Sequence, residues 1–448
     1  MPARPRGSTR RREGEHVYPS KPEPATVYEG RLFHRGRLVE AEMGVDDDGK
    51  IVAVAKQLRG GRRIHLGESI LLPSSIDLHV HFRDPGPPGE VEDLASGTVQ
   101  AALGGIGAVV DMPNTIPPLT TVERLEEKGD RIASRAWVDV LPYAALIPGV
   151  DVPGLARVAA GFKLFMGPTT GDLVTPADEE RRALLESVAR TGLPVHVHAE
   201  DAALFGHGHP PQDTDTWDQA RPMSSELSAI RSLRDHPRSL RLHICHATSP
   251  EAVVAAREIG ASTEATPHHL LLAASQFGNT QQKVNPPLRP ERVRQALWEE
   301  FQKGRVPMLA SDHAPHALAR KSLPFPDAPS GLPGVEVMLP LLLEQVRRGS
   351  LELATLVQVS ARRPALFLGV PRGSLAPGNE ADFLVVDFRA RRKIEARSLH
   401  APCGWTPYEG REAVFPQEHY LRGERIVEGG EFVPGRRARR LLPRPPGT

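Results

Sequence analysis

The chain has 448 residues, of which 40% are hydrophobic and 25% are charged, and it contains two cysteines. This composition is that of a globular protein and excludes a fibrous or wholly disordered chain and a disulfide-rich secreted domain. The formal net charge of +1 hides an acidic body between two basic ends. Neither a nucleic acid nor a membrane is expected as a partner, and the expected location is the cytoplasm.

The two ends of the chain have similar patterns. Residues 1–24 are rich in Arg and Pro and are predicted to form a disordered basic tail. Short alternating segments with Gly and Asp turns follow, and the same pattern returns near the C-terminus. We therefore predict a small β-sandwich domain built from residues 25–70 and 371–431. Residues 432–448 are predicted to be a second basic tail.

Residues 71–370 alternate between short apolar runs and amphipathic stretches typical of helices. Eight such runs occur in series, each followed by a polar cluster and then a helix-like segment: 75–82, 107–114, 137–146, 161–167, 194–200, 241–247, 262–269 and 307–316. Eight strand–helix units in series predict an α/β fold, a (β/α)8 TIM-type barrel. The polar clusters then lie at the carboxyl ends of the strands, where such barrels carry their active sites.

Four of these strand ends carry histidine or aspartate. The first run offers His79 and His81, which share one face of a strand because they are two residues apart. The fifth offers His198, the sixth His246 and the eighth Asp312. One such cluster could be a pair of buried structural histidines, but four at one rim favour a metal centre.

The fourth run contains a lysine, Lys163, between Phe162 and Leu164. Burial of an ammonium group is costly, which predicts a neutral or chemically altered amine, such as a carbamate formed with CO2. The alternative is a lysine whose stem packs while its ammonium group reaches solvent.

Eight motifs in this order and spacing resemble the dihydroorotase family, a cyclic amidohydrolase branch of the amidohydrolase superfamily. They are HVHFRDPG, DMPNT, GFKLFMG, HAED, HICHATS, TPHH, KVNPPLR and SDHAPH. The resemblance covers essentially residues 25–430 and implies two divalent metal ions, with Zn²⁺ as the expected metal. It implies the following roles: His79 and His81 bind one metal, His198 and His246 bind the other, carboxylated Lys163 bridges them, and Asp312 is both ligand and catalytic carboxylate. His196 and His243 do not match ligand positions and are interpreted as core residues.

The resemblance also implies a substrate site. Its residues are Arg83, Asn114, Asn285, His316, Gly331 and Gly334, with Arg83 suited to a carboxylate because its guanidinium forms a two-pronged donor. Cys245 is interpreted as a packed residue rather than a nucleophile. The loop after SDHAPH reads ALARKSLPF and lacks the acidic residue that often precedes its lysine in the family.

The expected activity is the reversible hydrolysis of (S)-dihydroorotate to N-carbamoyl-L-aspartate, a step of de novo pyrimidine (UMP) biosynthesis. Allantoinase and dihydropyrimidinase or hydantoinase activities are the alternatives, because those enzymes share the metal ligands. A further alternative is an inactive homologue that acts as a scaffold for another pyrimidine enzyme. A homodimer and an association with aspartate carbamoyltransferase are the partners considered besides the substrate.

Overall fold

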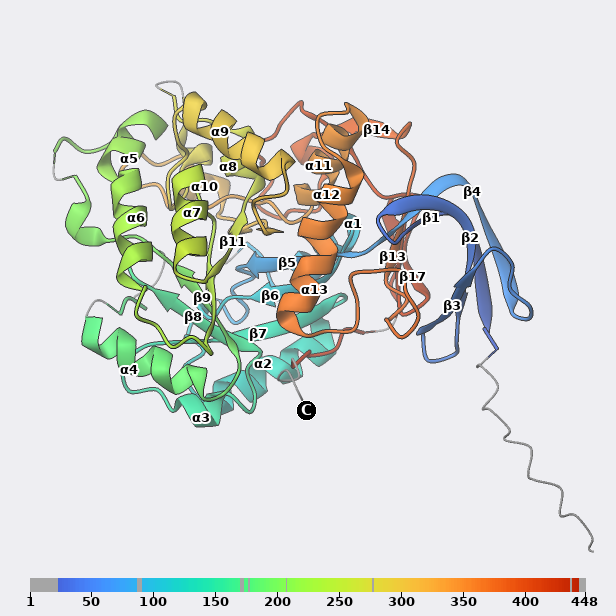
Figure 1. Cartoon of the computed structure of the whole chain (residues 1–448). Coiled ribbons are helices and arrows are strands. Elements are labelled where there is room, and N and C mark those ends of the chain that lie inside the picture. The colour runs from blue at the N-terminus through green and yellow to red at the C-terminus, as the bar shows by residue number, and fades with distance from the viewer. Residues whose placement is uncertain are drawn as a thin grey trace, which may run out of the picture.

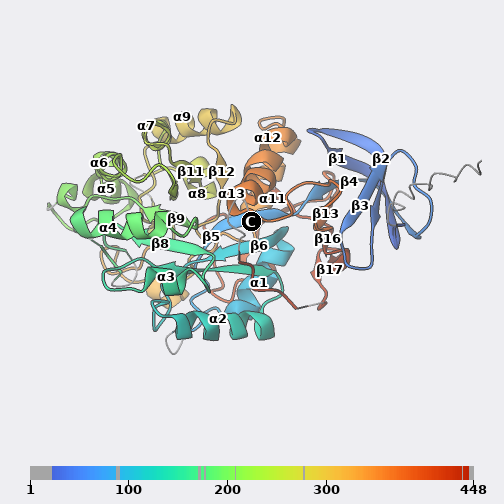
Figure 2. The ribbon, with the colours of Figure 1, turned by 60° about the horizontal axis from the view of Figure 1, so that its bottom comes forward.

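The computed structural model describes residues 23–86, 91–169, 173–175, 178–206, 208–275, 278–435 and 437–442. Two eight-stranded sheets dominate it, one in the middle of the chain and one formed by both ends. They lie side by side, with the sheet of the chain ends to the right of the helix-covered barrel (Figures 1 and 2). The predicted N-terminal tail falls, except for its last two residues, outside the described residues.

The central sheet is the predicted barrel. Its neighbouring strands are parallel and follow one another in chain order: β5 (Ser75–Val80), β6 (Ile106–Asp111), β7 (Asp139–Ala145), β8 (Gly161–Phe165), β9 (Pro194–His198), β10 (Arg241–Ile244), β11 (Ser262–Ala265) and β12 (Met308–Leu309). Each strand lies inside one of the eight predicted runs, except that β6 begins one residue before its run. Nearly all their residues are buried, as expected for parallel strands covered on both faces. The prediction of a TIM-type barrel is confirmed.

The barrel closes between its first strand and the segment after its last strand. Val80 forms a parallel bridge with His313, and the N–H of His81 donates to the carbonyl of His313 over 2.8 Å. Below this bridge, the buried carboxylate of Asp77 accepts from the backbone N–H groups of Ser311 (2.9 Å) and His79 (3.1 Å). Asp77 therefore joins the two segments that carry three predicted metal ligands.

Helices cover the outside of the barrel (Figure 1). They are α1 (Leu94–Leu103), α2 (Val122–Arg135), α3 (Val152–Leu155), α4 (Asp178–Ala189), α5 (Thr214–Ala220), α6 (Met223–Ser232), α7 (Pro250–Glu258), α8 (Pro267–Leu271), α9 (Glu291–Gln302), α10 (Leu318–Lys321), α11 (Met338–Arg347), α12 (Leu353–Val357) and α13 (Arg363–Leu368). Single 3₁₀ turns at Ala202–Leu204, Thr280–Gln282 and Ala396–Ser398 and a π-helical turn at Gln358–Arg362 complete the helical set. Many begin with a side-chain cap, such as Asp93 on α1 and Ser249 on α7.

The second sheet joins the two chain ends, as predicted. Its strands are β1 (Thr26–His34), β2 (Arg37–Val45), β3 (Ile51–Ala55) and β4 (Arg62–Pro73) from the N-terminal side, and β13 (Phe383–Val386), β16 (Glu418–Leu421), β17 (Glu424–Glu428) and β18 (Glu431–Phe432) from the C-terminal side. The ends meet where β4 pairs antiparallel with β13. In the core of this β domain Phe383 and Tyr420 stack with ring centroids 4.4 Å apart, and Tyr28 packs edge-on against both rings at 4.8 and 5.4 Å. A separate pair, β14 (Arg391–Lys393) and β15 (Glu412–Val414), lies between β13 and β16 in sequence.

The C-terminal segment 437–442 does not behave as the predicted tail. Arg439 and Leu441 exchange backbone hydrogen bonds with Val140 of β7 (3.1 and 2.9 Å), and Arg439 also donates from its backbone N–H to the buried carboxylate of Asp139 over 2.7 Å. Arg437 stacks on Trp137 at 3.7 Å from the ring centroid. The expectation of a solvated tail is wrong for residues 437–442, because their arginines contact backbone, carboxylate and aromatic groups of the barrel. Residues 443–448 lie outside the described residues.

A buried ion pair supports the strand ends next to the site. The ammonium of Lys128, on α2, lies 2.6 Å from the carboxylate of Asp111, at the end of β6, and both side chains are fully buried. The same ammonium donates to the carbonyl of Asp84, the residue after Arg83. Lys128 therefore links α2 to the loop that carries a predicted substrate-binding residue.

We expect Lys128→Met to lower the free energy of unfolding by about 3–5 kcal/mol, because it leaves the carboxylate of Asp111 buried without its cation. Urea unfolding measures this loss. The exposed Lys303→Met variant is the matched control and should change stability by less than about 0.5 kcal/mol. A loss of similar size in both variants would contradict the role of the buried pair.

Candidate active site

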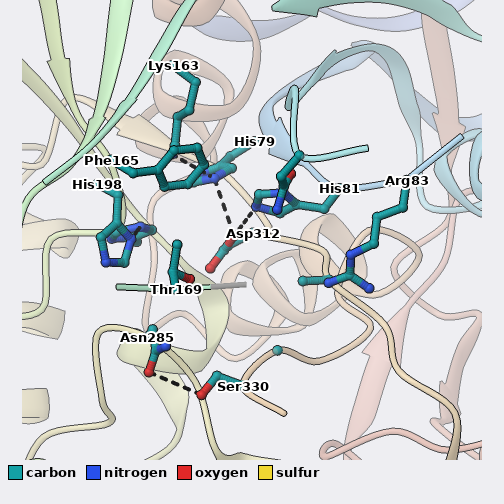
Figure 3. A pocket seen from close by; sticks show the side chains of 14 residues that line it. His79, His81, Arg83, Lys163, Phe165, Thr169, His198, Asn285, Asp312 and Ser330 are labelled. Atoms are coloured by element: carbon teal, nitrogen blue, oxygen red, sulfur yellow. Dashed lines mark hydrogen bonds and ion pairs between the residues drawn. The ribbon is translucent and has the colours of Figure 1, made fainter. Parts of the chain in front are cut away.

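A cavity opens at the carboxyl ends of the barrel strands and gathers most of the predicted site residues (Figure 3). It encloses about 390 Å³ of empty space, its mouth included. Its lining residues come from six of the eight strand ends and from two later loop segments: His79, His81, Arg83, Asn114, Lys163, Phe165, Thr169, His198, His246, Asn285, Asp312, Ala314, Ser330 and Gly331. Four lining residues were not predicted: Phe165 and Ala314, which lie inside motifs but carry no polar group, and Thr169 and Ser330, which lie outside the motifs.

Three predicted metal ligands converge on one point. Nε2 of His81 lies 3.2 Å, and Nε2 of His79 lies 3.4 Å, from the same carboxylate oxygen of Asp312. One ligand atom from each of the three lies within 4.8 Å of the others. Figure 3 shows Asp312 facing both imidazoles. This arrangement of two imidazoles and a carboxylate suits a divalent cation.

Hydrogen bonds fix how the first two imidazoles face the cavity. Nδ1 of His79 donates to Glu264 (2.8 Å), and Nδ1 of His81 donates to the amide oxygen of Asn114 (2.6 Å). In both rings Nε2 is then left to act as a ligand atom. Asn114, predicted as a substrate residue, thus also orients His81. Glu264 was missed, although its place at the end of the seventh predicted strand could have drawn attention to it.

A second pair of histidines lies beside the first group. Nδ1 of His198 is 3.1 Å from Nε2 of His246, and Nε2 of His198 donates to Glu200 over 2.7 Å. Burial disfavours the charge of Glu200, but the guanidinium of Arg221 and the imidazole of His198 together lower its pKa to about 2. Glu200 is therefore an anion at neutral pH and holds His198 so that Nδ1 faces His246.

Backbone conformation sets the direction of three site residues. Arg83, His246 and Asp312 each follow a barrel strand and have a positive φ, of 49°, 38° and 47°. His246 is three residues after His243, so in a regular strand the two side chains would point to opposite faces. The left-handed turn at His246 directs its ring into the cavity instead. Such strained residues are typical of functional sites.

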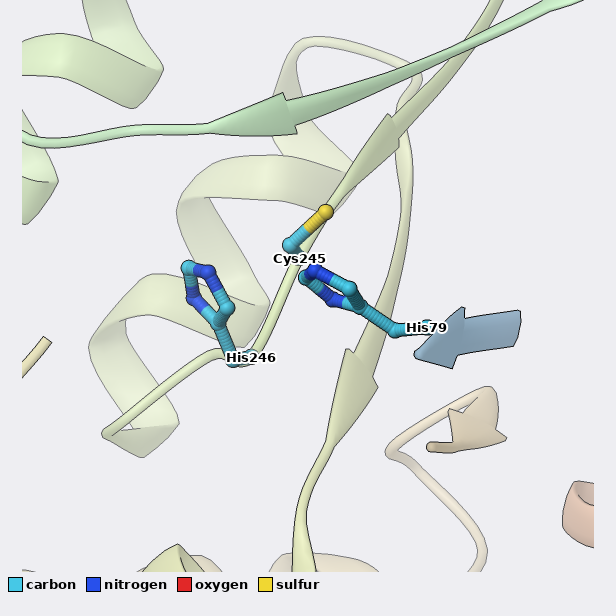
Figure 4. Close-up of side chains that lie close together, drawn as sticks. All are labelled: His79, Cys245 and His246. Atoms are coloured by element: carbon cyan, nitrogen blue, oxygen red, sulfur yellow. The ribbon is translucent and has the colours of Figure 1, made fainter. Parts of the chain in front are cut away.

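Lys163 is almost fully buried and lies between the two histidine groups. Its Nζ is 3.1 Å from Nε2 of His79 and donates to the thiol of Cys245 over 3.1 Å. The thiol of Cys245, with His79 and His246, forms a second set of candidate ligand atoms within 4.8 Å of one another (Figure 4). Burial raises the pKa of Cys245 to about 12, which keeps the thiol protonated in this environment.

The histidines that were predicted to be core residues lie deeper in the barrel. His196 and His243 are completely buried, with ring centroids 4.5 Å apart. Nε2 of His196 is 3.2 Å from the hydroxyl of Tyr143, and Nε2 of His243 is 3.0 Å from Glu264. Through Glu264, His243 supports the orientation of His79.

The predicted substrate residues fall into two groups. Arg83 is buried in the cavity wall, where its Nη1 donates to the carbonyl of Pro315 over 2.6 Å. His316 lies beside it, with Nε2 3.4 Å from Nη2 of Arg83, and donates to the carbonyl of Ser330 over 2.9 Å. Across the cavity, the hydroxyl of Ser330 donates to Asn285 over 3.1 Å.

The two predicted glycines have different positions. Gly331 lines the cavity with a φ of +129°, and a Cβ there would lie 2.5 Å from the carbonyl oxygen of Ala314. Gly334, which the family resemblance placed at the substrate, does not line this cavity. Its N–H donates instead to Nδ1 of His313 over 3.0 Å.

The residues present fit a metal centre with two positions. Nδ1 of His246 is buried and has no hydrogen-bond partner among the described residues. Burial and the nearby Lys163 lower the pKa of His79, so its ring is neutral, as a ligand must be. One position would use His79, His81 and Asp312, and the other would use His198 and His246, with Lys163 between them.

Comparison with known proteins agrees with this geometry. The family model described as the amidohydrolase family matches residues 70–407. A dihydroorotase from Halobacterium salinarum is 39% identical over 372 residues, which cover 80% of this chain and 86% of that protein. A dihydroorotase from Pyrococcus abyssi is 35% identical over 93% of this chain and 98% of its own length.

Solved structures share the fold. The L-hydantoinase (dihydropyrimidinase) from Arthrobacter aurescens has a TM-score of 0.81 and 26% identity, and covers 91% of this chain and 97% of its own. A D-hydantoinase has a TM-score of 0.84 at 22% identity, over 94% of this chain and 100% of its own. Members of the amidohydrolase family depend on divalent metal ions. The extent of these matches shows that the chain belongs to the amidohydrolase family and, within it, to the dihydroorotase family.

Proposed function

We propose that this protein is a dihydroorotase, which hydrolyses (S)-dihydroorotate reversibly to N-carbamoyl-L-aspartate in de novo pyrimidine biosynthesis. One observation carries the proposal. A single cavity holds a cluster of metal-binding side chains on one wall and the buried guanidinium of Arg83 on another. The cluster suits hydrolysis of a cyclic amide, and Arg83 suits the carboxylate that distinguishes dihydroorotate from uncharged cyclic amides.

Arg83 sets the orientation of the substrate in this proposal. The guanidinium is held by the carbonyl of Pro315 and lines the cavity, where it can donate to the substrate carboxylate. Asn285 and Ser330 lie on the wall that would face the ring. The amide bond to be cleaved then points toward Asp312.

Asp312 is the proposed general base and acid. Its carboxylate takes a proton from the attacking water and delivers it to the ring nitrogen as the amide bond breaks. Bound divalent metal ions supply the polarisation of the amide carbonyl and increase the acidity of the water. His79 and His81 hold Asp312 in place from one side, and Glu264 and Asn114 keep those two rings in a single orientation.

The proposed metal is Zn²⁺ at both positions, with Lys163 carboxylated between them. Two features support this choice. The ligands are mostly imidazoles, which suit zinc. The amine of Lys163 has no carboxylate partner among the described residues and lies against His79 and Cys245. Conversion of this amine to a carbamate would supply a negative charge to balance the charge of the two metal ions.

The deciding experiment combines turnover with metal content. The purified protein, loaded with Zn²⁺, is assayed for ring opening of dihydroorotate, allantoin and hydantoin, and its bound metal is counted. We expect turnover of dihydroorotate and two metal ions per chain. Activity on allantoin or hydantoin alone would overturn the substrate, and a stable protein without metal would favour the scaffold alternative.

Arg83→Lys tests the carboxylate contact. Lysine keeps the charge but loses the two-pronged donor, so KM for dihydroorotate should rise between about tenfold and a hundredfold with little change in kcat. Steady-state kinetics measure this, with the exposed Arg320→Lys as the control. An unchanged KM would exclude Arg83 as the carboxylate-binding residue.

The remaining partner predictions are separate from this function. A homodimer and an association with aspartate carbamoyltransferase stay predictions, which sedimentation of the protein alone and in a mixture would test. Among the described residues, no helix has the length and apolar character to cross a membrane.

A further inference from the structure

The loop after β12 forms the wall of the cavity opposite the barrel strands. It runs from His316 through α10 to Gly331, and its end places Ser330 and Gly331 on the cavity. Most of this loop has no regular secondary structure between α10 and Gly331. Its position must therefore come from side chains that hold its backbone.

Lys283 holds the middle of this loop. Its ammonium group donates to the carbonyls of Phe325 (2.7 Å), Pro326 (3.1 Å) and Ala328 (2.8 Å). The ammonium group also lies over the rings of Trp217 and Phe325, whose centroids are 4.6 and 5.2 Å from Nζ. The three N–H bonds of one ammonium are thus directed at a single turn of the loop.

Lys321 holds the end of the loop. Its ammonium donates to the carbonyls of Pro329 (2.9 Å), Gly331 (3.0 Å) and Lys283 (3.3 Å). The N–H of Gly331 donates in turn to the carbonyl of Lys283 over 2.9 Å. Lys321 therefore lies between the loop and the segment that carries Asn285, and it fixes Ser330 between the two residues it bonds.

Both lysines are buried, and neither forms an ion pair within 4 Å in the described part of the chain. Lys283 is 3% exposed and Lys321 is 1% exposed, and the carboxylate of Asp327 acts on Lys283 only through a weaker electrostatic interaction. Burial lowers the pKa of Lys321 to about 7 and that of Lys283 to about 8. Burying two lysine side chains is a costly means of stabilising a loop where apolar side chains could pack, which indicates a purpose beyond stability.

We propose that Lys283 and Lys321 are positioning residues for the substrate: their ammonium groups hold residues 325–331 so that Ser330 and Gly331 form the wall against which the ring binds. The inference rests on the proposed function and deepens it. Neither lysine lies in the wall of the cavity, so both act through the backbone they hold. A misplacement of about 1 Å caused by a change far from the reacting atoms can lower the catalytic efficiency, kcat/KM, by about a hundredfold.

Lys321→Met tests the proposal, because methionine fills similar space without donating. For the zinc-loaded enzyme we expect KM for dihydroorotate to rise between about tenfold and a hundredfold, with kcat changed less than about threefold. Lys283→Met is the second variant, with a smaller expected rise in KM, because its bonds lie farther from Ser330. Lys303→Met, at the exposed residue that directly follows α9, is the control and should leave both constants unchanged.

Hydrogen exchange of the same variants gives a readout that does not depend on turnover. The peptide covering residues 322–331 should exchange at least about tenfold faster in Lys321→Met, with exchange elsewhere in the barrel unchanged. If the wild-type enzyme does not open the ring of dihydroorotate, the proposed function is wrong. The hydrogen-exchange measurement still shows in that case whether Lys321 holds residues 322–331 in place. A folded Lys321→Met variant with unchanged KM, or with unchanged loop exchange, would overturn the positioning role. A loss confined to kcat would overturn it as well.

Discussion

Asp312→Asn is expected to lower kcat for dihydroorotate hydrolysis by about a thousandfold. The substitution keeps the shape of the side chain, but an amide neither accepts the proton of the attacking water nor returns it to the ring nitrogen. Asp312 is also the carboxylate that faces both Nε2 atoms, 3.2 and 3.4 Å away. The number of metal ions bound by the variant separates the loss of proton transfer from the loss of a metal ligand.

The expected pattern for this variant is lost turnover with a retained fold. Thermal unfolding should be close to that of the wild type, since Asp312 contacts the other candidate ligands rather than the core. Asp130→Asn, on the exposed face of α2, is the matched control and should keep full activity. If Asp312→Asn kept more than about a tenth of the wild-type kcat, the general acid–base role would be wrong.

Lys163→Ala is expected to lower kcat/KM by about a thousandfold and to reduce the number of bound metal ions. The side chain reaches from β8 to within 3.1 Å of both His79 and Cys245. Alanine leaves a space between the two histidine groups and removes the proposed bridging carbamate. Metal content and kinetics, measured on the same preparation, check the prediction.

Chemical rescue distinguishes the carbamate from the amine. Added acetate or propionate should restore part of the activity of Lys163→Ala, because a small carboxylate can occupy the space that the side chain leaves. Rescue by methylamine instead would indicate that the free amine is the working form. Undiminished activity of the variant would contradict any bridging role, and Lys303→Ala serves as the control for a lysine lost from the surface.

Much of the fold could be predicted because it depends on local patterns. Apolar runs at regular intervals, separated by amphipathic stretches, were sufficient to place all eight barrel strands, and the Gly and Asp turns indicated the strands of the β domain. Arginine-rich composition predicted a solvated C-terminal tail, yet residues 437–442 pair with β7. That contact depends on Asp139 and Trp137, which lie about 300 residues earlier in the chain, and no local pattern reveals it.

The residues of the site can also be divided into those that local motifs predicted and those that they did not. Motifs identified His79, His81, Lys163 and Asp312, because their residue types at strand ends carry the chemistry. They did not identify Glu264, which orients His79, or Ser330, which lines the cavity beside Asn285. These contacts join residues that are distant in sequence and have no distinctive spacing.

The motifs that resemble those of dihydroorotases indicated the family, while residue type, spacing and periodicity predicted the barrel and the types of side chain at the strand ends. Only the tertiary structure decided which side chains meet. It turned His246 toward the cavity through a positive φ, excluded Gly334 from the wall, and joined Lys283 and Lys321 to one loop. The physical reason is that strand ends distant in sequence converge at one rim, where backbone turns and long-range hydrogen bonds set the direction of each group.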